Sequence, residues 1–388
     1  MRKLASAIGL AAMTAMIATA PAMAAERVVK VGITVPLTGA AAALGIGARN
    51  ALSLAPDHVG DIKIDWIVLD DATDTTRAVV NTNKLISEGK VDVMVGSSTS
   101  HETLAIINPI FEAKVPLISL AAAAVLVQPL DDKRKWVFKT AANDSVMAEG
   151  IANHMAARGV KTLGVIGFDD SYGESWLEQI KIFAGAKNIA IVDSERFART
   201  DSSAVGQVLK LIAAKPDAIL VVGSSAPAAM PHMELKDKGY KGLIYQTHGS
   251  ASADFLKVGG SALNGSFVSV GPSLVWDQLP DSNPVKKPAS EFMPRYEEKF
   301  GKGQRTNFAA QAFDAWLILA AAIPEAARHA EPGTQAYRAA LRDAIEGIKD
   351  LHGNAGVFNF SPTNHAGLDS RGRVIVEIEK GSWKYSSD

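Results

Sequence analysis

The sequence predicts an α/β protein with parallel sheets, and three observations support this fold class. Short apolar runs of strand length alternate with segments whose apolar residues recur at helical spacing. Two such runs, 91–96 and 115–118, each end in a loop of small residues, as neighbouring parallel strands do at one sheet edge. The chain has 388 residues, enough for two domains. Regular strand–helix alternation places strands in parallel sheets with helices on their faces.

The first part of the chain begins this alternation. A strand over 28–36 leads through small residues into a helix over 46–55, and a second strand covers 62–69. Asp74 is expected to cap the next helix, which runs to Ser87, because an aspartate side chain accepts bonds from the first free N–H groups.

The alternation continues to residue 246 and is followed by a proline-rich loop over 271–287 and three helices. The alternating apolar and polar residues of Arg373 to Glu379 predict an edge strand. Further strands are expected at 136–139, 163–168, 189–193, 218–222 and 243–246, and further helices at 145–158, 204–213, 227–238, 288–300, 306–328 and 334–349.

The loop after the run 91–96 contains Ser98, Thr99 and Ser100, and a segment with helical spacing follows from Thr103. The first N–H groups of a helix lack intrahelical partners and favour negative charge. The second loop, Ala121 to Ala123, has small side chains that leave its backbone accessible. Together the loops predict a site for a small carboxylate. The alternative is that these serines only cap the helix.

Composition and motifs exclude several classes of function. The formal net charge is −1, which gives no basis for binding nucleic acid or an anionic membrane. The chain has no cysteine, eight histidines, and no serine-hydrolase elbow, zinc-protease motif or phosphate-binding loop. Adjacent residues such as Ser100 and His101 rarely point together as nucleophile and base. We therefore expect no enzyme activity, no metal site and no cofactor.

The N-terminus has the pattern of a secretory signal peptide. Two basic residues precede an apolar run from Leu4 to about Ala20, and Ala22-Met23-Ala24 forms a cleavage site. Residues 1–24 are thus expected to be removed rather than to anchor the chain. Without cysteine there is no site for a lipid anchor, so we expect a free periplasmic protein.

Several segments, in this order along the chain, resemble the type I periplasmic solute-binding proteins of ABC importers, in the branched-chain amino-acid-binding (Leu/Ile/Val) family. The resemblance implies two α/β lobes, each a mostly parallel sheet flanked by helices, around a ligand cleft. It implies an N-lobe of residues 25–141 plus 271–371 and a C-lobe of 142–270 plus 372–388. The matching segments are Val31–Gly39, Asp70–Asp74, 91–124, Asp170–Gly173 and Pro216–Gly223.

The resemblance also implies roles for residues of the N-lobe loops. Ser100 matches the family serine whose hydroxyl and N–H hold the ligand carboxylate, and Ser98 lies in the same loop. Ala121 matches a position that offers its backbone carbonyl to the ligand. Ala123 falls where amino-acid binders usually have threonine, so its N–H remains and the hydroxyl is lost.

Other matched positions surround the rest of the expected ligand. Tyr172 matches the C-lobe aromatic residue that closes over it, and Ser225 lies in a loop that faces the cleft. Leu44 replaces a common aromatic residue at the apolar end. Phe308 either lines that end or belongs to the core of its helix.

His248 is the most informative departure, because amino-acid binders have a glutamate there that pairs with the ligand ammonium. Imidazole cannot supply that negative charge, and a buried ammonium without one is costly. The ligand is therefore expected to be a carboxylate without an α-amine, such as an aromatic acid or a 2-oxo acid, including aryl 2-oxo acids. The alternative is that His248 is a surface residue and the match slips by one position.

The expected function is delivery of this ligand to a membrane ABC permease by a monomeric receptor that closes its cleft. Two alternatives remain open on the same fold: a branched-chain amino-acid-binding protein, and a periplasmic sensor that passes its signal to a membrane receptor.

Overall fold

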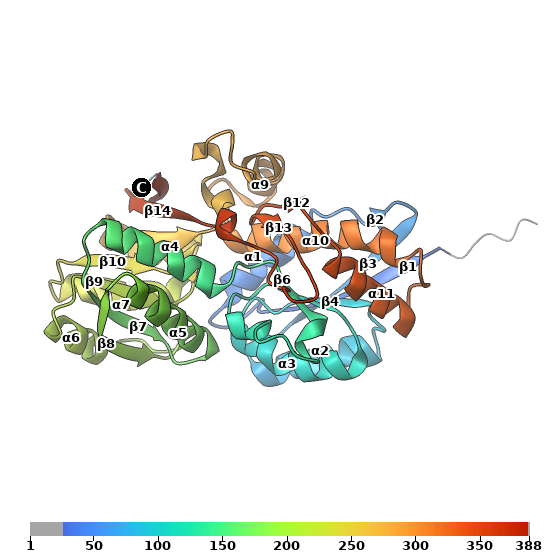
Figure 1. The fold of residues 1–388 in the computed structure, drawn as a ribbon, viewed down its shortest axis with the longest axis horizontal. Helices are drawn as coiled ribbons and strands as arrows, with labels where there is room; N and C mark the ends of the chain where they lie inside the picture. The colour runs from blue at the N-terminus through green and yellow to red at the C-terminus, as the bar shows by residue number, and fades with distance from the viewer. Residues whose placement is uncertain (1–25, 387–388) are drawn as a thin grey trace, which may run out of the picture.

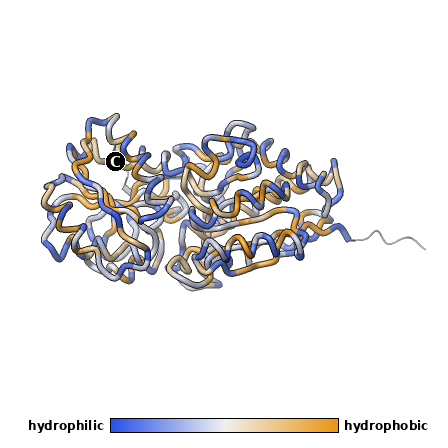
Figure 2. The backbone as a smooth tube through the Cα atoms, turned by 90° about the horizontal axis from the view of Figure 1, so that it is seen from below, coloured by the Kyte–Doolittle hydropathy of each residue, from blue (hydrophilic) through white to orange (hydrophobic). Residues whose placement is uncertain are grey.

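The computed structural model describes residues 26–386, which form two lobes lying side by side (Figure 1). Each lobe contains its own mostly parallel sheet flanked by helices. Figure 2 shows hydrophobic stretches running through the interior of both lobes. The predicted two-lobe α/β architecture is confirmed. The signal peptide expected over 1–24 lies outside the described residues.

The first sheet has the strand order β2-β3-β1-β4-β5-β6, and all its pairs are parallel except β2 with β3. Its strands are β1 (Val28–Val35), β2 (His58–Val59), β3 (Ile62–Asp70), β4 (Val93–Gly96), β5 (Leu117–Ser119) and β6 (Val137–Lys139). The helices of this lobe are α1 (Ala42–Leu52), α2 (Thr75–Ser87), α3 (Ser100–Ala113), α9 (Lys286–Phe300), α10 (Asn307–Ala326) and α11 (Gln335–Glu346), and a small antiparallel pair follows, β12 (Leu351–His352) and β13 (Val357–Phe358).

The second sheet has the order β15-β14-β11-β10-β9-β7-β8, and its pairs from β11 to β8 are parallel. Its strands are β7 (Thr162–Phe168), β8 (Ala190–Phe197), β9 (Ala218–Val222), β10 (Leu243–Gln246), β11 (Phe267–Val270), β14 (Val374–Glu379) and β15 (Ser382–Ser386). Its helices are α4 (Asp144–Ala157), α5 (Ser171–Ala186), α6 (Val205–Ala213), α7 (Ala229–Asp237) and α8 (Ala253–Gly259).

The chain passes between the sheets three times. It leaves the first sheet after β6, returns from β11 to the helices α9 to α11, and re-enters the second sheet at β14. These passages bracket the three crossovers expected from the sequence. The boundaries at 141, 271 and 371 themselves stay a prediction.

Helix α10 is the central helix of the first lobe and packs against α1 and α11. By length and composition it is the one helix of the described part that could cross a membrane, but 78% of its most apolar window is buried inside the protein. The Asp74 side chain accepts a bond from the Arg77 N–H at 2.7 Å, which confirms the predicted cap of α2.

Several elements differ from the sequence-based expectation. Strand β11, helix α8 and the short strands β2, β12, β13 and β15 were not expected. Two further differences have a clear physical reason. Helix α1 begins at Ala42 rather than near residue 46, because its glycines serve close packing and not a loop: a Cβ on Gly45 would lie 2.0 Å from the Pro36 carbonyl oxygen. The prediction that 373–379 is an edge strand was wrong. After a turn at Lys380 and Gly381, both with positive φ (50° and 72°), β15 folds back and covers β14.

A buried carboxylate fastens the end of the first lobe to its central helix. Asp314 on α10 accepts bonds from the Asn354 N–H (2.7 Å), the Asn354 side-chain amide (2.8 Å) and the Ala355 N–H (2.6 Å). Burial raises the pKa of Asp314 to about 7. The Asp314 carboxyl group thus satisfies three buried donors of the segment between β12 and β13.

We expect Asp314→Ala to lower the free energy of unfolding by about 2–4 kcal/mol, because it leaves these buried donors without an acceptor. Urea unfolding measures this change. Asp343→Ala, on the exposed face of α11, is the control and should stay within about 0.5 kcal/mol of the parent. An equal, small effect of both substitutions would contradict the assigned role of Asp314.

Candidate functional site

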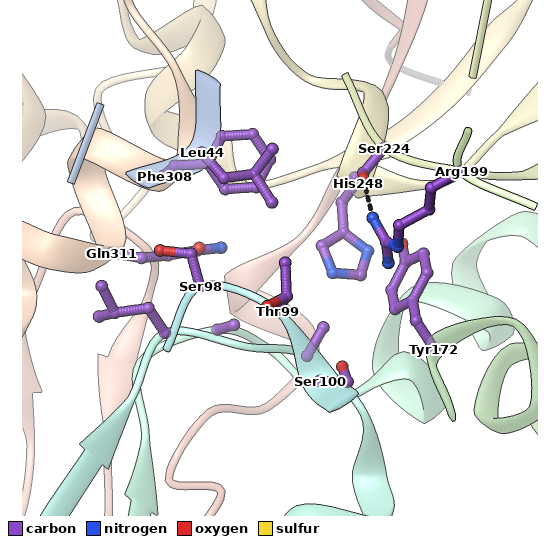
Figure 3. A pocket seen from close by; sticks show the side chains of 14 residues that line it. Leu44, Ser98, Thr99, Ser100, Tyr172, Arg199, Ser224, His248, Phe308 and Gln311 are labelled. Carbon is purple, nitrogen blue, oxygen red and sulfur yellow. Dashed lines mark hydrogen bonds between the residues drawn. The ribbon is translucent and has the colours of Figure 1, made fainter. Parts of the chain in front are cut away.

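Both sheets direct the carboxyl ends of their parallel strands toward the junction of the lobes, where open α/β sheets bind ligands. The loops after β4 and β5 of the first lobe and after β7, β8, β9 and β10 of the second contribute to one cavity there. About 350 Å³ of the space between the lining residues is free of protein atoms, and this volume includes space open to solvent. The lining residues of the cavity (Figure 3) are Leu44, Ser98, Thr99, Ser100, Leu120, Ala122, Ala141, Tyr172, Arg199, Ser224, His248, Gly249, Phe308 and Gln311.

The loop between β4 and α3 is held from behind by buried side chains. Ser97 Oγ donates to Asp71 Oδ2 at 2.9 Å, and Thr99 Oγ1 donates to Glu102 on α3. Thr103 Oγ1 donates to the Thr99 carbonyl at 2.8 Å. Burial raises the pKa of Asp71 to about 7, so this carboxyl group is readily kept as a neutral hydrogen-bonding partner. These contacts fix the loop without using the hydroxyl groups of Ser98 and Ser100.

The serine hydroxyls of this loop do not cap helix α3. The N-cap residue is Thr99, and its side chain makes no capping bond to the backbone. Ser100 Oγ instead accepts a bond from the Ala123 N–H at 3.3 Å, across to the second loop. Ser98 Oγ is buried and has no hydrogen-bond partner in the described residues. Both hydroxyls are therefore available at the wall of the cavity.

A buried ammonium lies behind the second loop. Lys139 Nζ donates to the carbonyls of Ala122 and Ala123, the latter at 3.2 Å, and to Asn143 Oδ1 at 2.6 Å. Burial lowers the pKa of Lys139, and the neighbouring carboxyl group of Asp144 opposes that change. The loop carbonyls thus already have a cationic donor.

Two ring side chains come from the second lobe. Tyr172, in the first turn of α5, donates its hydroxyl to Thr247 Oγ1 at 2.8 Å. The ring of His248 meets the Tyr172 ring edge-on, with centroids 6.1 Å apart. Gly249 permits this contact, because a Cβ there would lie 2.9 Å from the Tyr172 hydroxyl.

His248 is neutral at physiological pH. Burial lowers its pKa to about 3, and the positive charge of Lys139 adds to the effect. Its Nδ1 is buried without a hydrogen-bond partner among the described residues. The imidazole can therefore offer a neutral hydrogen-bonding group to a ligand, and it supplies no negative charge.

Arg199 follows β8 and brings a guanidinium group to the cavity. Its Nε donates to Asp170 Oδ2 at 2.6 Å and its Nη1 donates to Ser224 Oγ at 2.8 Å (Figure 3). The group also lies over the Phe168 ring, 4.1 Å from the centroid. Three neighbours thus hold the guanidinium in one place.

The opposite part of the cavity is apolar. Leu44 of α1 and Phe308 of α10 pack together with Ala41 in a small buried cluster of their own, and Figure 3 shows both side chains facing the cavity. Leu120 adds another apolar side chain to the lining. Polar groups at one part and apolar groups at the other suit an amphipathic small molecule.

Six of the nine residues expected at the site line this cavity: Leu44, Ser98, Ser100, Tyr172, His248 and Phe308. Ala121, Ala123 and Ser225 are buried but do not line it. The side chains of Ala121 and Ala123 pack in the core below α3, and the neighbouring residues Ala122 and Ser224 reach the cavity instead. The alternative that His248 is a surface residue is wrong, since it is 2% exposed.

Sequence reasoning missed Arg199, Ser224 and Gln311. A single arginine in the loop after β8 has no local pattern that would identify it, although its partner Asp170 belongs to a recognised segment. Within residues 26–386, no group of three or more histidine, aspartate or glutamate side chains is placed to hold a metal ion.

Comparison with known proteins agrees with this architecture. The sequence pattern of a family described as "Periplasmic binding protein" matches residues 28–381. The Leu/Ile/Val-binding protein homolog 3 of Brucella melitensis is 23% identical over 351 residues, which cover 88% of this chain and 89% of that protein.

Solved structures give the same result. An extracellular ligand-binding receptor from Rhodopseudomonas palustris HaA2 is 42% identical, with a TM-score of 0.90 over 93% of this chain and 100% of that chain. A solute-binding protein of an ABC transporter from R. palustris, solved in complex with benzoate, has the same fold at 21% identity, with a TM-score of 0.79 over 92% of this chain and 95% of that chain. The family match over nearly the whole described chain and this similarity mean that the chain belongs to the periplasmic binding protein family.

Proposed function

We propose that this protein is the periplasmic receptor of an ABC importer and binds a small carboxylate that has no α-ammonium group. An aromatic acid or a 2-oxo acid, including aryl 2-oxo acids, fits this description. The protein would close around the ligand and deliver it to a membrane permease, without chemical change and without a cofactor. We further propose that it acts as a monomer.

The observation that carries the proposal is the charge of the cavity. None of the fourteen described lining residues has a carboxylate side chain, and one has a guanidinium group. His248 stands where a counter-charge for an ammonium would be expected, and it is neutral. An ammonium brought into this water-poor cavity would remain uncompensated, which costs several kcal/mol for a buried ion.

The backbone of the second loop, Ala121 to Ala123, also disfavours a ligand ammonium. The carbonyls of Ala122 and Ala123 accept from the Lys139 ammonium, whose charge would repel a ligand ammonium brought to the same oxygens. A carboxylate meets a different set of groups: the Ser98 and Ser100 hydroxyls and the N-terminal turn of α3. The apolar cluster of Leu44 and Phe308 would receive a ring or an alkyl chain.

The comparisons favour two different ligand classes, and one other role is compatible with the fold. The relatives named as Leu/Ile/Val-binding proteins favour a branched-chain amino acid as ligand. The benzoate complex of the R. palustris protein favours an aromatic acid. A sensor that signals through a membrane receptor would use the same cleft, and a permease gene beside this one would support transport.

We expect Ser100→Ala to weaken binding of the carboxylate by about 1–3 kcal/mol, the range for a lost hydrogen bond to a charged group. Isothermal titration calorimetry measures the change. Ser171→Ala is the matched control, since Ser171 also begins a helix but does not line the cavity. Unchanged affinity in the Ser100 variant would remove this residue from the carboxylate clamp.

A thermal-shift screen tests the ligand class, because a ligand raises the melting temperature by mass action. Benzoate, phenylpyruvate or related acids should raise it by several degrees at millimolar concentration, and leucine, isoleucine and valine far less. A large shift with leucine and none with the acids would return the protein to the amino-acid binders.

His248→Glu should weaken binding of the acid at least about tenfold, because the new carboxylate would face the ligand's own negative charge in a low-dielectric cavity. Calorimetry with the acid found in the screen measures this. His329→Glu introduces the same residue in the exposed turn after α10 and should leave the affinity unchanged. Equal affinities in both variants would exclude contact between His248 and the ligand's anionic end.

Export is tested separately. The Ala22-Met23-Ala24 site predicts that the periplasmic fraction contains a protein whose first residue is Ala25. N-terminal sequencing of that protein decides the matter, and cell-associated protein that retains Met1 would contradict it.

A further inference from the structure

Arg199 is the one lining residue of the cavity, among the described residues, that carries a permanent charge. It comes from the second lobe, whereas the serine-rich loop Ser98 to Ser100 comes from the first. Both line the same cavity, so one small ligand bound there would lie within reach of both. Figure 3 shows the guanidinium next to His248 and Tyr172, with the His248 ring drawn between it and Thr99.

The carboxylate partner of Arg199, Asp170, also bonds to other groups. Asp170 accepts not only from Arg199 but also from the N–H groups of Tyr172 and Gly173, as the N-cap of α5. Asp170 Oδ2 also lies 3.9 Å from His101 Nδ1 of the first lobe. Asp170 is thus held by several donors, and its bond to Arg199 uses only the Nε of the guanidinium.

Arg199 also has donor capacity left. A guanidinium has five N–H donors, and the bonds of Arg199 within the described residues use Nε and Nη1. Its Nη2 has no hydrogen-bond partner there, and its side chain is 11% exposed at a position that lines the cavity. The bonds to Asp170 and Ser224 and the contact with Phe168 orient these remaining donors in advance.

We infer that Arg199 is a specificity-determining residue that pairs with the ligand carboxylate from the second lobe. The inference rests on the proposed function, in which the ligand is a carboxylate. The anion would be held on one side by the serine-rich loop and on the other by the guanidinium, a strong charge-assisted contact. Because the two anchors belong to different lobes, the negative charge of the ligand would favour the closed form, and a ligand without that charge would not.

The competing explanation is that Arg199 has a purely structural role and only forms the ion pair with Asp170. The two explanations differ in what happens to neutral ligands. A charge-pairing Arg199 contributes to binding of an acid and little to binding of its uncharged amide. A structural Arg199 supports the shape of the cavity and affects both alike.

The experiment measures affinity for benzoate and phenylpyruvate, and for benzamide as the neutral analogue of benzoate, by calorimetry. The variants are Arg199→Gln, Arg199→Lys and the control Arg196→Gln. Arg196 lies on β8, pairs with Glu174 and does not line the cavity. Melting temperatures of all variants are recorded so that loss of fold is seen directly.

In the wild type we expect the acids to bind far more tightly than benzamide. Arg199→Gln should weaken binding of the acids 10- to 100-fold and leave benzamide within about threefold, consistent with loss of a charge-assisted hydrogen bond. Arg199→Lys should retain part of the acid affinity because the charge remains. Arg196→Gln should behave as the wild type.

Acid affinity within about twofold of the wild type in Arg199→Gln would overturn the inference while leaving the proposed function intact. Equal losses for benzoate and benzamide would also overturn it, because they indicate a structural role. Failure of the proposed function appears earlier, in the wild type, as binding of leucine and of neither acid, and in that case the role of Arg199 is rejected with it.

Discussion

The buried ammonium of Lys139 is the interaction on which the ligand cavity depends. Its Nζ holds the carbonyls of Ala122 and Ala123 and the side chain of Asn143, at the end of the last strand of the first sheet. The neighbouring carboxyl group of Asp144 begins the first helix of the second lobe, so the pair lies where the chain passes between lobes. A single ion buried this deeply would cost several kcal/mol, and only the complete set of partners makes it tolerable.

This arrangement sets the chemistry of the site. With the Ala122 and Ala123 carbonyls bonded to Lys139, the second loop directs the Ala123 N–H toward Ser100. Burial keeps His248 neutral by lowering its pKa, and the positive charge of Lys139 adds to that effect. The cavity wall therefore offers donors, hydroxyls and a guanidinium, and its polar part is suited to an anion. Ligand charge, loop geometry and lobe closure are in this way parts of one electrostatic arrangement.

Much of the fold was predictable because it depends on local pattern. Strand-length apolar runs and helical spacing located most of the longer elements, although not strand β11 or helix α8. Asp74 was correctly predicted as a helix cap because that preference depends only on neighbouring residues. The misplaced start of α1 came from glycines that pack against Pro36, a contact invisible in sequence. Whether β14 is an edge strand depends on whether residues 382–386 pair with it as β15. The alternation of apolar and polar residues within β14 cannot show that pairing.

Site residues were predictable where the resemblance to the family matched individual positions of the two sequences. Tyr172 and His248 lie seventy-six positions apart, yet their rings are in edge contact. Arg199 shows the limit: its importance comes from the meeting of three loops, after β7, β8 and β9, that no spacing in the sequence connects. Ala121 shows a second limit. In this loop after a strand, the side chain of Ala121 packs in the core, whereas that of the next residue, Ala122, lines the cavity, so an error of one position names the wrong residue.

The central claim is that the cavity accepts a carboxylate and rejects the α-ammonium of an amino acid. Calorimetric titration of the wild-type protein with leucine and with 4-methyl-2-oxopentanoate tests it most directly, because the two ligands share the carboxylate and the side chain and differ at the α-carbon. The charge of the cavity predicts that the 2-oxo acid binds at least about a hundredfold more tightly, given the cost of an uncompensated buried ion. Equal affinities, or tighter binding of leucine, would contradict this account.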